Sequence, residues 1–348
     1  MKDKNENITQ KSNKFSVSTE AINPVTGDPV RIVAALGGNA LEDKDLPPTA
    51  ESQLIVVKKT AEHLAELSCR GYELAVVHGN GPQIGRILLA SEYAKEVTAP
   101  MPFDVCGAMS QGYIGYHLQQ ALSQALYKRK RFLPVVTVVT QVAVDPKDPA
   151  FERPSKPIGP FYSLEEAERL QKEKGWGLVE DSGRGWRRVV PSPKPHEIIE
   201  IGTIRTLWHT TITIACGGGG IPVIIRPDNT LEGVAAVIDK DLAAEKLAED
   251  MNADVLLILT EVEKVYLNFN RPDQRALDKI SPDEANRYIK EGHFPAGSML
   301  PKMEAAVKFA SSRPGRKAII TSLYAACEAL AGNTGTLICN EEAAHVKI

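Results

Sequence analysis

Short apolar, β-branched runs alternate with helical patterns through most of this 348-residue chain. Continuous apolar runs are typical of parallel strands buried on both faces, and their alternation with helices indicates β-α-β units. The predicted strands cover residues 31–37, 73–78, 132–139, 211–216, 223–225, 254–260, 317–321 and 336–339. The predicted helices cover residues 49–70, 240–251, 301–311 and 323–331, with further helical stretches between the second strand and residue 127. We therefore expect an α/β fold with a mainly parallel sheet covered on both faces.

Composition divides the chain into four segments. Residues 1–30 contain four lysines, four acids and few apolar side chains, which predicts a disordered polar leader without the apolar stretch of a secretory signal. Eight of the 23 prolines fall in residues 141–200, so we expect a separate lobe over residues 142–195 between two halves, 31–141 and 196–348. The lobe contains a capping box from Ser163 to Glu166, a helix stop at Gly175, and two short strands over 176–180 and 186–190. One helix and a hairpin predict a small lid rather than a full domain.

Charge and cysteine usage exclude several classes of protein. Lysine and arginine number 41 against 44 acids, a net charge of −3, so no bulk field attracts nucleic acid or anionic lipid. No run approaches the ~18 apolar residues of a transmembrane helix. The five cysteines are far apart and form no C-x-x-C pair, so we expect no disulfide framework and a reducing, cytoplasmic location. The seven histidines lack close metal-ligand spacing, so we expect no metal held by the protein alone.

Three glycine-rich turns each follow a predicted strand, at residues 36–40, 78–85 and 216–222. Glycine lets backbone N–H groups approach an anion closely, and ligands of open α/β sheets sit at strand ends. Three such turns predict a phosphate-type site, although each alone could be an ordinary tight turn. The second turn is related to the dinucleotide fingerprint, but the expected second strand ending in an acidic residue about 20 residues further on is missing, because residues 92–112 contain prolines, glycines and a helix-like pattern. A Walker A loop is excluded because the chain contains no Gly-Lys dipeptide.

Two lysines lie where a helix is predicted to begin. Lys240 follows Asp239, a suitable N-cap, and Lys302 follows Pro301, which suits a first helical turn. A helix N-terminus favours anions, so a cation there is unfavourable unless an anion lies nearby. Asp241 could hold both ammonium groups in place and keep them charged. The alternatives are solvated surface lysines and an ordinary first-turn acid.

In the lobe, Lys156 lies in the proline-rich segment 153–162. The residue before a proline is restricted to extended conformations, so Lys156 could be presented on a stiff arm to a cleft. The alternative from the residues alone is a proline-rich surface linker.

Taken together, these segments resemble the carbamate kinases of the amino acid kinase family, from residue 31 to about residue 340. The resemblance rests on residues 35–41, 78–83, 104–112, 156–162, 189–195, 216–222, 237–242 and 301–302. It implies an αβα sandwich with an eight-stranded, mainly parallel sheet and a small protruding lid, assembled as a homodimer. It also implies a phosphotransferase with a carboxyl-group acceptor, which transfers phosphoryl reversibly between ATP and carbamate to give ADP and carbamoyl phosphate. Mg²⁺ would accompany ATP or ADP, and arginine catabolism would use the reaction to make ATP.

The resemblance assigns roles to individual residues. Residues 31–141 would hold carbamate or carbamoyl phosphate, residues 142–195 would form the lid, and residues 196–348 would bind the nucleotide. Catalytic roles fall on Lys156, Lys240, Asp241 and Lys302. Substrate and phosphate contacts fall on Gly37, Gly38, Asn39, Gly79, Asn80, Gly81, Gly218 and Gly219, and nucleotide contacts on Thr260, Glu261, Tyr266 and Met299. Glu261 departs from the aspartate that is common at this position in the wider family.

Two alternatives remain beside this interpretation. Another amino acid kinase, such as acetylglutamate kinase, would share the sheet but take a larger acyl phosphate, and the Lys156 arm argues against it. A catalytically silent ligand-binding module would share the whole fold, and the presence of Lys240, Asp241 and Lys302 argues against that.

Overall fold

A central sheet of eight strands forms the middle layer of the computed structural model, which describes residues 21–24, 26–181 and 183–340. Its strands run in the order β15-β17-β16-β12-β1-β2-β9-β3. All neighbouring strands are parallel except β16 and β17, which are antiparallel. The bounds are β1 Arg31–Leu36, β2 Glu73–His78, β3 Val135–Thr137, β9 Ile212–Ile214, β12 Val255–Thr260, β15 Lys279–Ile280, β16 Lys317–Ser322 and β17 Thr336–Ile338. The predicted α/β class and mainly parallel sheet are confirmed.

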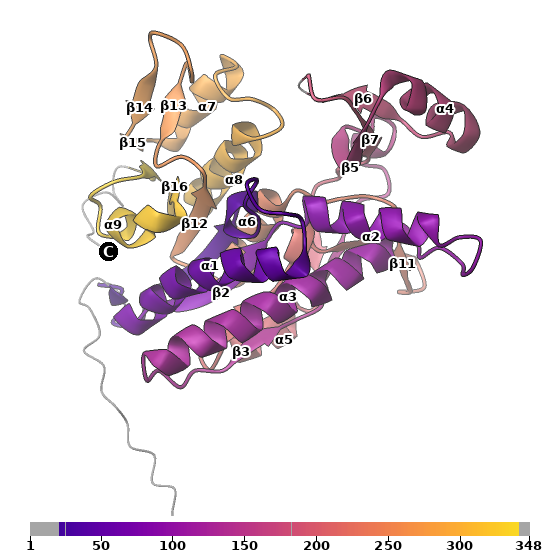
Figure 1. Cartoon of the computed structure of the whole chain (residues 1–348). Helices are drawn as coiled ribbons and strands as arrows, with labels where there is room; N and C mark the ends of the chain where they lie inside the picture. The colour runs from indigo at the N-terminus through magenta and orange to yellow at the C-terminus, as the bar shows by residue number, and fades with distance from the viewer. Residues whose placement is uncertain (1–20, 25, 182, 341–348) are drawn as a thin grey trace, which may run out of the picture.

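Helices cover both faces of this sheet (Figure 1). Side chains of β1 alternate between two cores: Ile32 and Ala34 pack on one face, and Val33 and Ala35 on the other. The first core takes in α1 (Ala50–Arg70), α3 (Phe103–Lys128) and α9 (Ala326–Leu330), and the second takes in α5 (Ile201–Leu207), α6 (Lys240–Asp250), α7 (Pro282–Lys290) and α8 (Met299–Ser312). Burial on both sides explains why the strands read as continuous apolar runs.

Smaller elements surround the carboxyl ends of the central strands. A four-stranded sheet has the order β11 (Leu231–Gly233), β10 (Ile221–Ile225), β4 (Gln141–Ala143) and β8 (Glu197–Ile198), and β13 (Val265–Leu267) forms a hairpin with β14 (Arg275–Leu277). The lid consists of β5 (Lys156–Tyr162), β7 (Trp186–Val190), β6 (Leu178–Glu180) and α4 (Leu164–Lys174). It projects from the sheet beside α2 (Gly81–Tyr93), and α2 contacts β5 directly (Figure 1). Short 3-10 turns complete the chain at η2 (Gly38–Ala40), η3 (Pro149–Phe151), η4 (Gly217–Gly219) and η5 (Leu323–Ala325).

The predicted capping box, helix end and hairpin of the lid are confirmed. Ser163 and Glu166 form the predicted capping box, and Gly175 ends α4 in the left-handed conformation with φ 65°. The expected hairpin is formed by β6 and β7, which pair antiparallel.

The structure differs from the predicted strands at two points. The run at residues 223–225 belongs to β10, which pairs with β4 and β11 in the four-stranded sheet instead of joining the central one. The eighth central strand is β15, which has two residues and is too short to leave a periodic signal.

None of the helices in the described parts of the chain has the length and apolar character needed to cross a membrane.

The predicted leader over residues 1–30 extends too far. Residues 1–20 lie outside the described residues, but Ala21 is fully buried in the core and Ile22 pairs with Pro29 in a β-bridge. The Asn23 amide Nδ2 donates to Asp254 Oδ1 at 2.9 Å, and the other Asp254 oxygen accepts from the backbone N–H of Arg31. The folded unit therefore includes residues 21–24 and 26–30, which stabilise the start of β1.

We expect removal of residues 1–30 to lower the free energy of unfolding relative to a chain lacking only residues 1–20. The loss should be about 2 kcal/mol, because a charge-assisted hydrogen bond and a buried side chain disappear together. Urea denaturation followed by circular dichroism measures the difference. Equal midpoints for the two truncated chains would show that residues 21–30 add nothing to the fold.

Candidate active site

One buried carboxylate joins two lysines at the centre of the site. Asp241, in the first turn of α6, accepts from Lys240 Nζ at 2.6 Å through Oδ1 and from Lys302 Nζ at 2.9 Å through Oδ2. Lys302 comes from the first turn of α8, so the contact joins two helices. Asp239 is the predicted N-cap of α6, and its Oδ1 accepts from the backbone N–H of Asp241 at 2.9 Å. Asp241 is therefore fixed both by its own helix and by the neighbouring one.

The charges of this triad are perturbed by burial and by one another. Burial raises the pKa of Asp241, but the two ammonium groups together outweigh it and lower the pKa to about 2. Burial also lowers the pKa of Lys240, whereas for Lys302 the Asp241 carboxylate outweighs burial and raises the pKa. Two ammonium groups share one carboxylate, so the charged triad has a net charge of +1 in a largely buried position. Such a site favours an anion that can approach both lysines.

Two cavities meet at these lysines. The first, of about 240 Å³, lies under the lid, and its walls include Lys156, Asn80 and Gly81. The second, of about 370 Å³, opens toward the β13–β14 hairpin. Both cavities are lined by Gly38, Lys240, Gly297, Ser298 and Lys302. A group that passes from one cavity to the other would therefore pass the two ammonium groups.

The glycine turns lie at this junction, as their positions in the sequence predicted. Gly79 lies against Lys240, and a Cβ there would be 3.3 Å from the lysine Cδ. The Asn39 amide donates to the carbonyl of Thr260 at 3.2 Å and thereby joins the first turn to the end of β12. Gly37 and Asn39 line the second cavity, Gly79, Asn80, Gly81 and Gly218 line the first, and Gly38 lines both.

Gly219 differs from the other glycines assigned to phosphate. It lines neither cavity, and a Cβ there would lie 2.1 Å from the carbonyl oxygen of Ile238. With φ at +97°, its backbone also favours glycine. The structure thus places Gly219 behind the site, where it lets η4 pack against the segment before α6.

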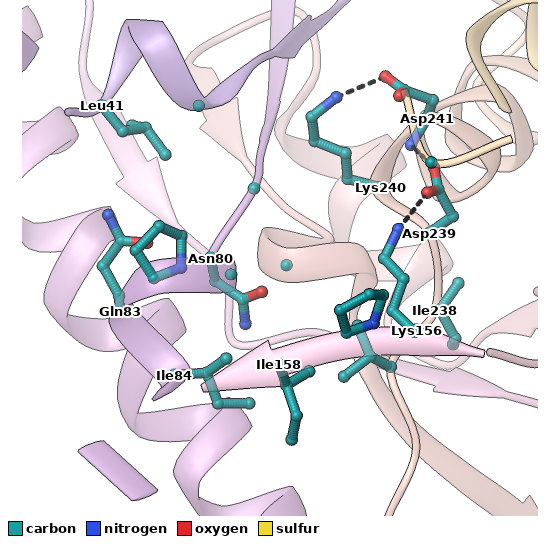
Figure 2. A pocket seen from close by; sticks show the side chains of 18 of the residues that line it. Leu41, Asn80, Gln83, Ile84, Lys156, Ile158, Ile238, Asp239, Lys240 and Asp241 are labelled. Carbon is teal, nitrogen blue, oxygen red and sulfur yellow. Dashed lines mark hydrogen bonds and ion pairs between the residues drawn. The ribbon is translucent and has the colours of Figure 1, made fainter. Parts of the chain in front are cut away.

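Lys156 reaches the site from the lid, as Figure 2 shows. Its Nζ donates to Asp239 Oδ2 at 2.7 Å, across 83 positions of sequence. The lysine is half-buried, which does not fit a surface linker. Asp239 therefore has two partners: one oxygen caps α6 and the other holds the lid lysine. Only the capping role was predicted from the sequence.

The residues assigned to the nucleotide come together in the second cavity. Thr260, Glu261, Tyr266 and Met299 all line it. The Glu261 side chain is largely exposed and lies 3.5 Å from Lys44 Nζ in a surface ion pair, so it is the least buried of the four contacts. Phe269, His293 and Ser298 also line this cavity and were not identified from the sequence. Of these, only Ser298 had a signal, because it lies beside Met299 in the segment that precedes Lys302.

Two polar residues support the glycine turns and were given no role from the sequence. Gln111 of α3 is buried; its amide nitrogen donates to the carbonyls of Thr140 and Gly217, and its oxygen accepts from the Thr140 N–H. Burial lowers the pKa of His78 to about 4, so this imidazole is neutral at pH 7. A neutral ring whose Nδ1 lies 2.8 Å from the Gly79 carbonyl supports the turn rather than acting as a surface base.

A second ionic contact joins α6 and α8 behind the triad. Lys308 Nζ donates to Glu245 Oε2 at 2.6 Å, while Glu245 Oε1 is buried without a hydrogen-bond partner among the described residues. Burial raises the pKa of Glu245 to about 7, although Lys308 acts in the opposite direction. The contact therefore changes its charge near neutral pH.

Comparison with known proteins places the chain in a family. The model of the amino acid kinase family matches residues 30–322. A carbamate kinase of Clostridium perfringens is 54% identical over 89% of this chain and 99% of its own length, and one of Pyrococcus horikoshii is 50% identical over the same shares. The carbamate kinase of Giardia lamblia, solved bound to AMP-PNP, superposes with a TM-score of 0.83 at 44% identity, covering 89% of this chain and 98% of that one.

The chain therefore belongs to the amino acid kinase family. It is a phosphotransferase, and within the family it falls among the carbamate kinases.

The raised pKa of Glu245 predicts a pH-dependent stability. Between about pH 4.5 and 7, the folded chain holds a proton that the unfolded chain has released, so raising the pH across this window lowers stability. Relative to Glu245→Gln, the parent chain should lose up to about 3 kcal/mol of unfolding free energy from pH 4.5 to pH 8. Glu168→Gln, which replaces an exposed glutamate of α4 far from this contact in the sequence, is the control and should follow the parent. Parallel stability curves for the parent and Glu245→Gln would contradict the assignment.

Proposed function

We propose that the chain is a carbamate kinase that catalyses reversible phosphoryl transfer between ATP and carbamate. The observation that supports this most strongly is the Lys240–Asp241–Lys302 triad at the junction of two cavities. Relatives of the chain at 50–54% identity are named for the same activity. The nucleotide would occupy the second cavity, and carbamate or carbamoyl phosphate the first.

In the proposed reaction a carbamate oxygen attacks the γ-phosphorus of ATP, and the bond from that phosphorus to the β–γ bridging oxygen breaks to release ADP. Carbamate is already an anionic nucleophile, so no general base is required. Negative charge on the transferring group is stabilised by fixed cations and by N–H groups that do not have to reorganise. Lys240 and Lys302 supply the cations, and Asp241 holds both in place.

Mg²⁺ is proposed to enter with the nucleotide, because this ion is usually bound through substrate phosphates and one or two carboxylates. The carboxylates nearest the junction are Asp239 and Asp241, and both already accept from lysine ammonium groups. We therefore assign the ion to the phosphate oxygens and assign no residue of this chain to it. Bound there, it would neutralise part of the phosphate charge.

Lys156 is proposed to bind the small substrate. In this structure it lies on Asp239, so the substrate anion must compete with that carboxylate for the ammonium group. Carbamate and carbamoyl phosphate are labile in water, and the lid that presents Lys156 would also limit solvent access. A short reach onto a small anion favours carbamate over the larger acyl groups of other amino acid kinases.

Three finer assignments are also proposals. A homodimer is supported by α3, where Val105, Met109, Tyr116 and Tyr127 form one exposed apolar stripe, continued by Phe132. Synthesis of ATP from carbamoyl phosphate during arginine catabolism is suggested by the resemblance, as is a cytoplasmic location, which the five free cysteines suit.

The activity is tested by following ATP formation from ADP and carbamoyl phosphate with a coupled hexokinase assay. We expect saturable turnover with carbamoyl phosphate and far lower kcat/KM with acetyl phosphate, which lacks the amino group. No ATP formation by the purified, folded chain would refute the proposed function, and preference for acetyl phosphate would refute the substrate assignment.

Lys240→Ala and Lys302→Ala should each lower kcat by about 10²–10³, the effect of removing one preorganised group that stabilises the transition state. Lys246→Ala is the control, because Lys246 lies on the same helix but pairs with Asp250 at its other end. Steady-state kinetics in the direction of ATP synthesis measures the effect. Near-normal turnover in either active-site variant would show that its lysine does not contact the transferring group.

Lys156→Met should lower kcat/KM for carbamoyl phosphate by about 10²-fold, through a higher KM, a lower kcat or both. KM for ADP should change less than about twofold. The selectivity arises because Lys156 lines the first cavity but not the second. Lys194→Met replaces an exposed lysine in the segment that follows β7 and serves as the control. If KM for ADP rose in parallel, the proposed role of Lys156 at the small substrate would be wrong.

A further inference from the structure

A third cavity lies between the lid and α2, outside both halves of the candidate active site. Its volume is about 410 Å³, larger than either cavity at the triad and within the range of small-molecule sites. Ile158 of β5 contributes to this cavity and to the first active-site cavity, so the two lie on either side of the strand that begins with Lys156.

Apolar and aromatic side chains form part of the wall of this cavity, beside charged ones. They include Leu88 of α2 and Ile158, Tyr162, Leu170 and Trp176 of the lid. Such walls suit a flat apolar body. The two glycines at the base, Gly85 and Gly159, lie so close that a Cβ on Gly85 would be 2.7 Å from Gly159 Cα. This contact holds the lid and α2 together at one end of the cavity.

Arg188 supplies a positive charge on the lid side. Its guanidinium lies 4.3 Å from the centre of the Trp176 ring and 5.9 Å from that of Phe103. The side chain is half-buried, and burial lowers its pKa. Within the described chain, its guanidinium forms no ion pair or hydrogen bond. It lies over aromatic rings, and the nearby Glu92 carboxylate, which acts on it electrostatically, is already bound to Lys174. An arginine removed from water normally has a carboxylate or phosphate partner.

The half-buried charges next to Arg188 have partners of their own. On the same hairpin, Arg184 and Arg187 both bind Asp181. Of the three acids that line the cavity, Glu92 binds Lys174, Glu166 caps α4, and Glu173 is exposed. Lys174 also lies 4.6 Å from the Trp176 ring, so two cations lie over one indole, and of these two only Lys174 is bound to a carboxylate among the described residues. The cavity therefore contains a half-buried cation without a carboxylate bound to it.

We propose that the cavity between the lid and α2 is a binding site for a small aromatic anion. The ring would lie against Trp176 and the apolar wall, and its carboxylate or sulfonate would accept two hydrogen bonds from the planar Arg188 guanidinium. This site is distinct from the triad and does not depend on the proposed function.

The test uses 8-anilinonaphthalene-1-sulfonate, an aromatic sulfonate whose fluorescence rises when it leaves water. We titrate the full-length chain in the presence of saturating Mg-ADP and, separately, phosphate, which occupy the nucleotide cavity and compete for simple anion sites. We expect saturation at one probe per chain in both cases. Displacement by Mg-ADP would place the probe in the nucleotide cavity and overturn the proposal, and displacement by phosphate or unsaturable binding would mean an adventitious additive only.

Variants assign the site to Arg188. Arg188→Gln should weaken probe binding at least tenfold, and Arg184→Gln should match the parent. Arg188→Lys should lie between the two, because it keeps the charge but loses the paired N–H donors and the planar group. Arg184 is the matched control, because it lies on the same hairpin over Phe161 and pairs with Asp181. Unchanged ADP binding shows that each variant is folded. Equal probe affinity in Arg188→Gln and the parent would overturn the proposal.

Discussion

The sharing of Asp241 between Lys240 and Lys302 is the interaction on which the rest of the site depends. An isolated ammonium group this deeply buried would tend to lose its proton, and two of them would repel each other. The Asp241 carboxylate holds both ammonium groups in place, and the three groups together have a net charge of +1. That surplus explains why a chain with a net charge of −3 can bind small polyanions: it uses local placement of lysines and not an overall field.

The fold supplies this geometry by placing two helix N-termini at one edge of the sheet. Helices α6 and α8 pack side by side, joined in front by Asp241 and behind by Glu245 and Lys308. The glycine turns after β1 and β2 lie opposite, where backbone can approach a ligand closely. The lid adds a third lysine from a separate small sheet, and in this structure that lysine is bonded to Asp239. The three lysines thus come from different parts of the molecule.

The sequence was most informative where the signal is local. Apolar runs identified most central strands, and the start of α6 was correct because Asp239 is a capping residue directly before a helical pattern. The contact from Lys156 to Asp239 joins residues 83 positions apart. Neither segment carries a local pattern that depends on the other, so local patterns could not predict this contact. Strand β15 was missed because two residues cannot show a period, and the folded start of the chain was missed because Ala21 is a single buried residue in a polar segment.

The most direct test is a crystal structure with Mg-ADP, aluminium fluoride and carbamate, which together mimic the transferring phosphoryl group. We expect the fluoride group at the junction of the two cavities, within hydrogen-bond distance of Lys240 Nζ and Lys302 Nζ, with both still bonded to Asp241. Lys156 should have left Asp239 for the carbamate side of the complex. A fluoride group remote from both lysines, or Lys156 unchanged on Asp239 with the site filled, would contradict the mechanism.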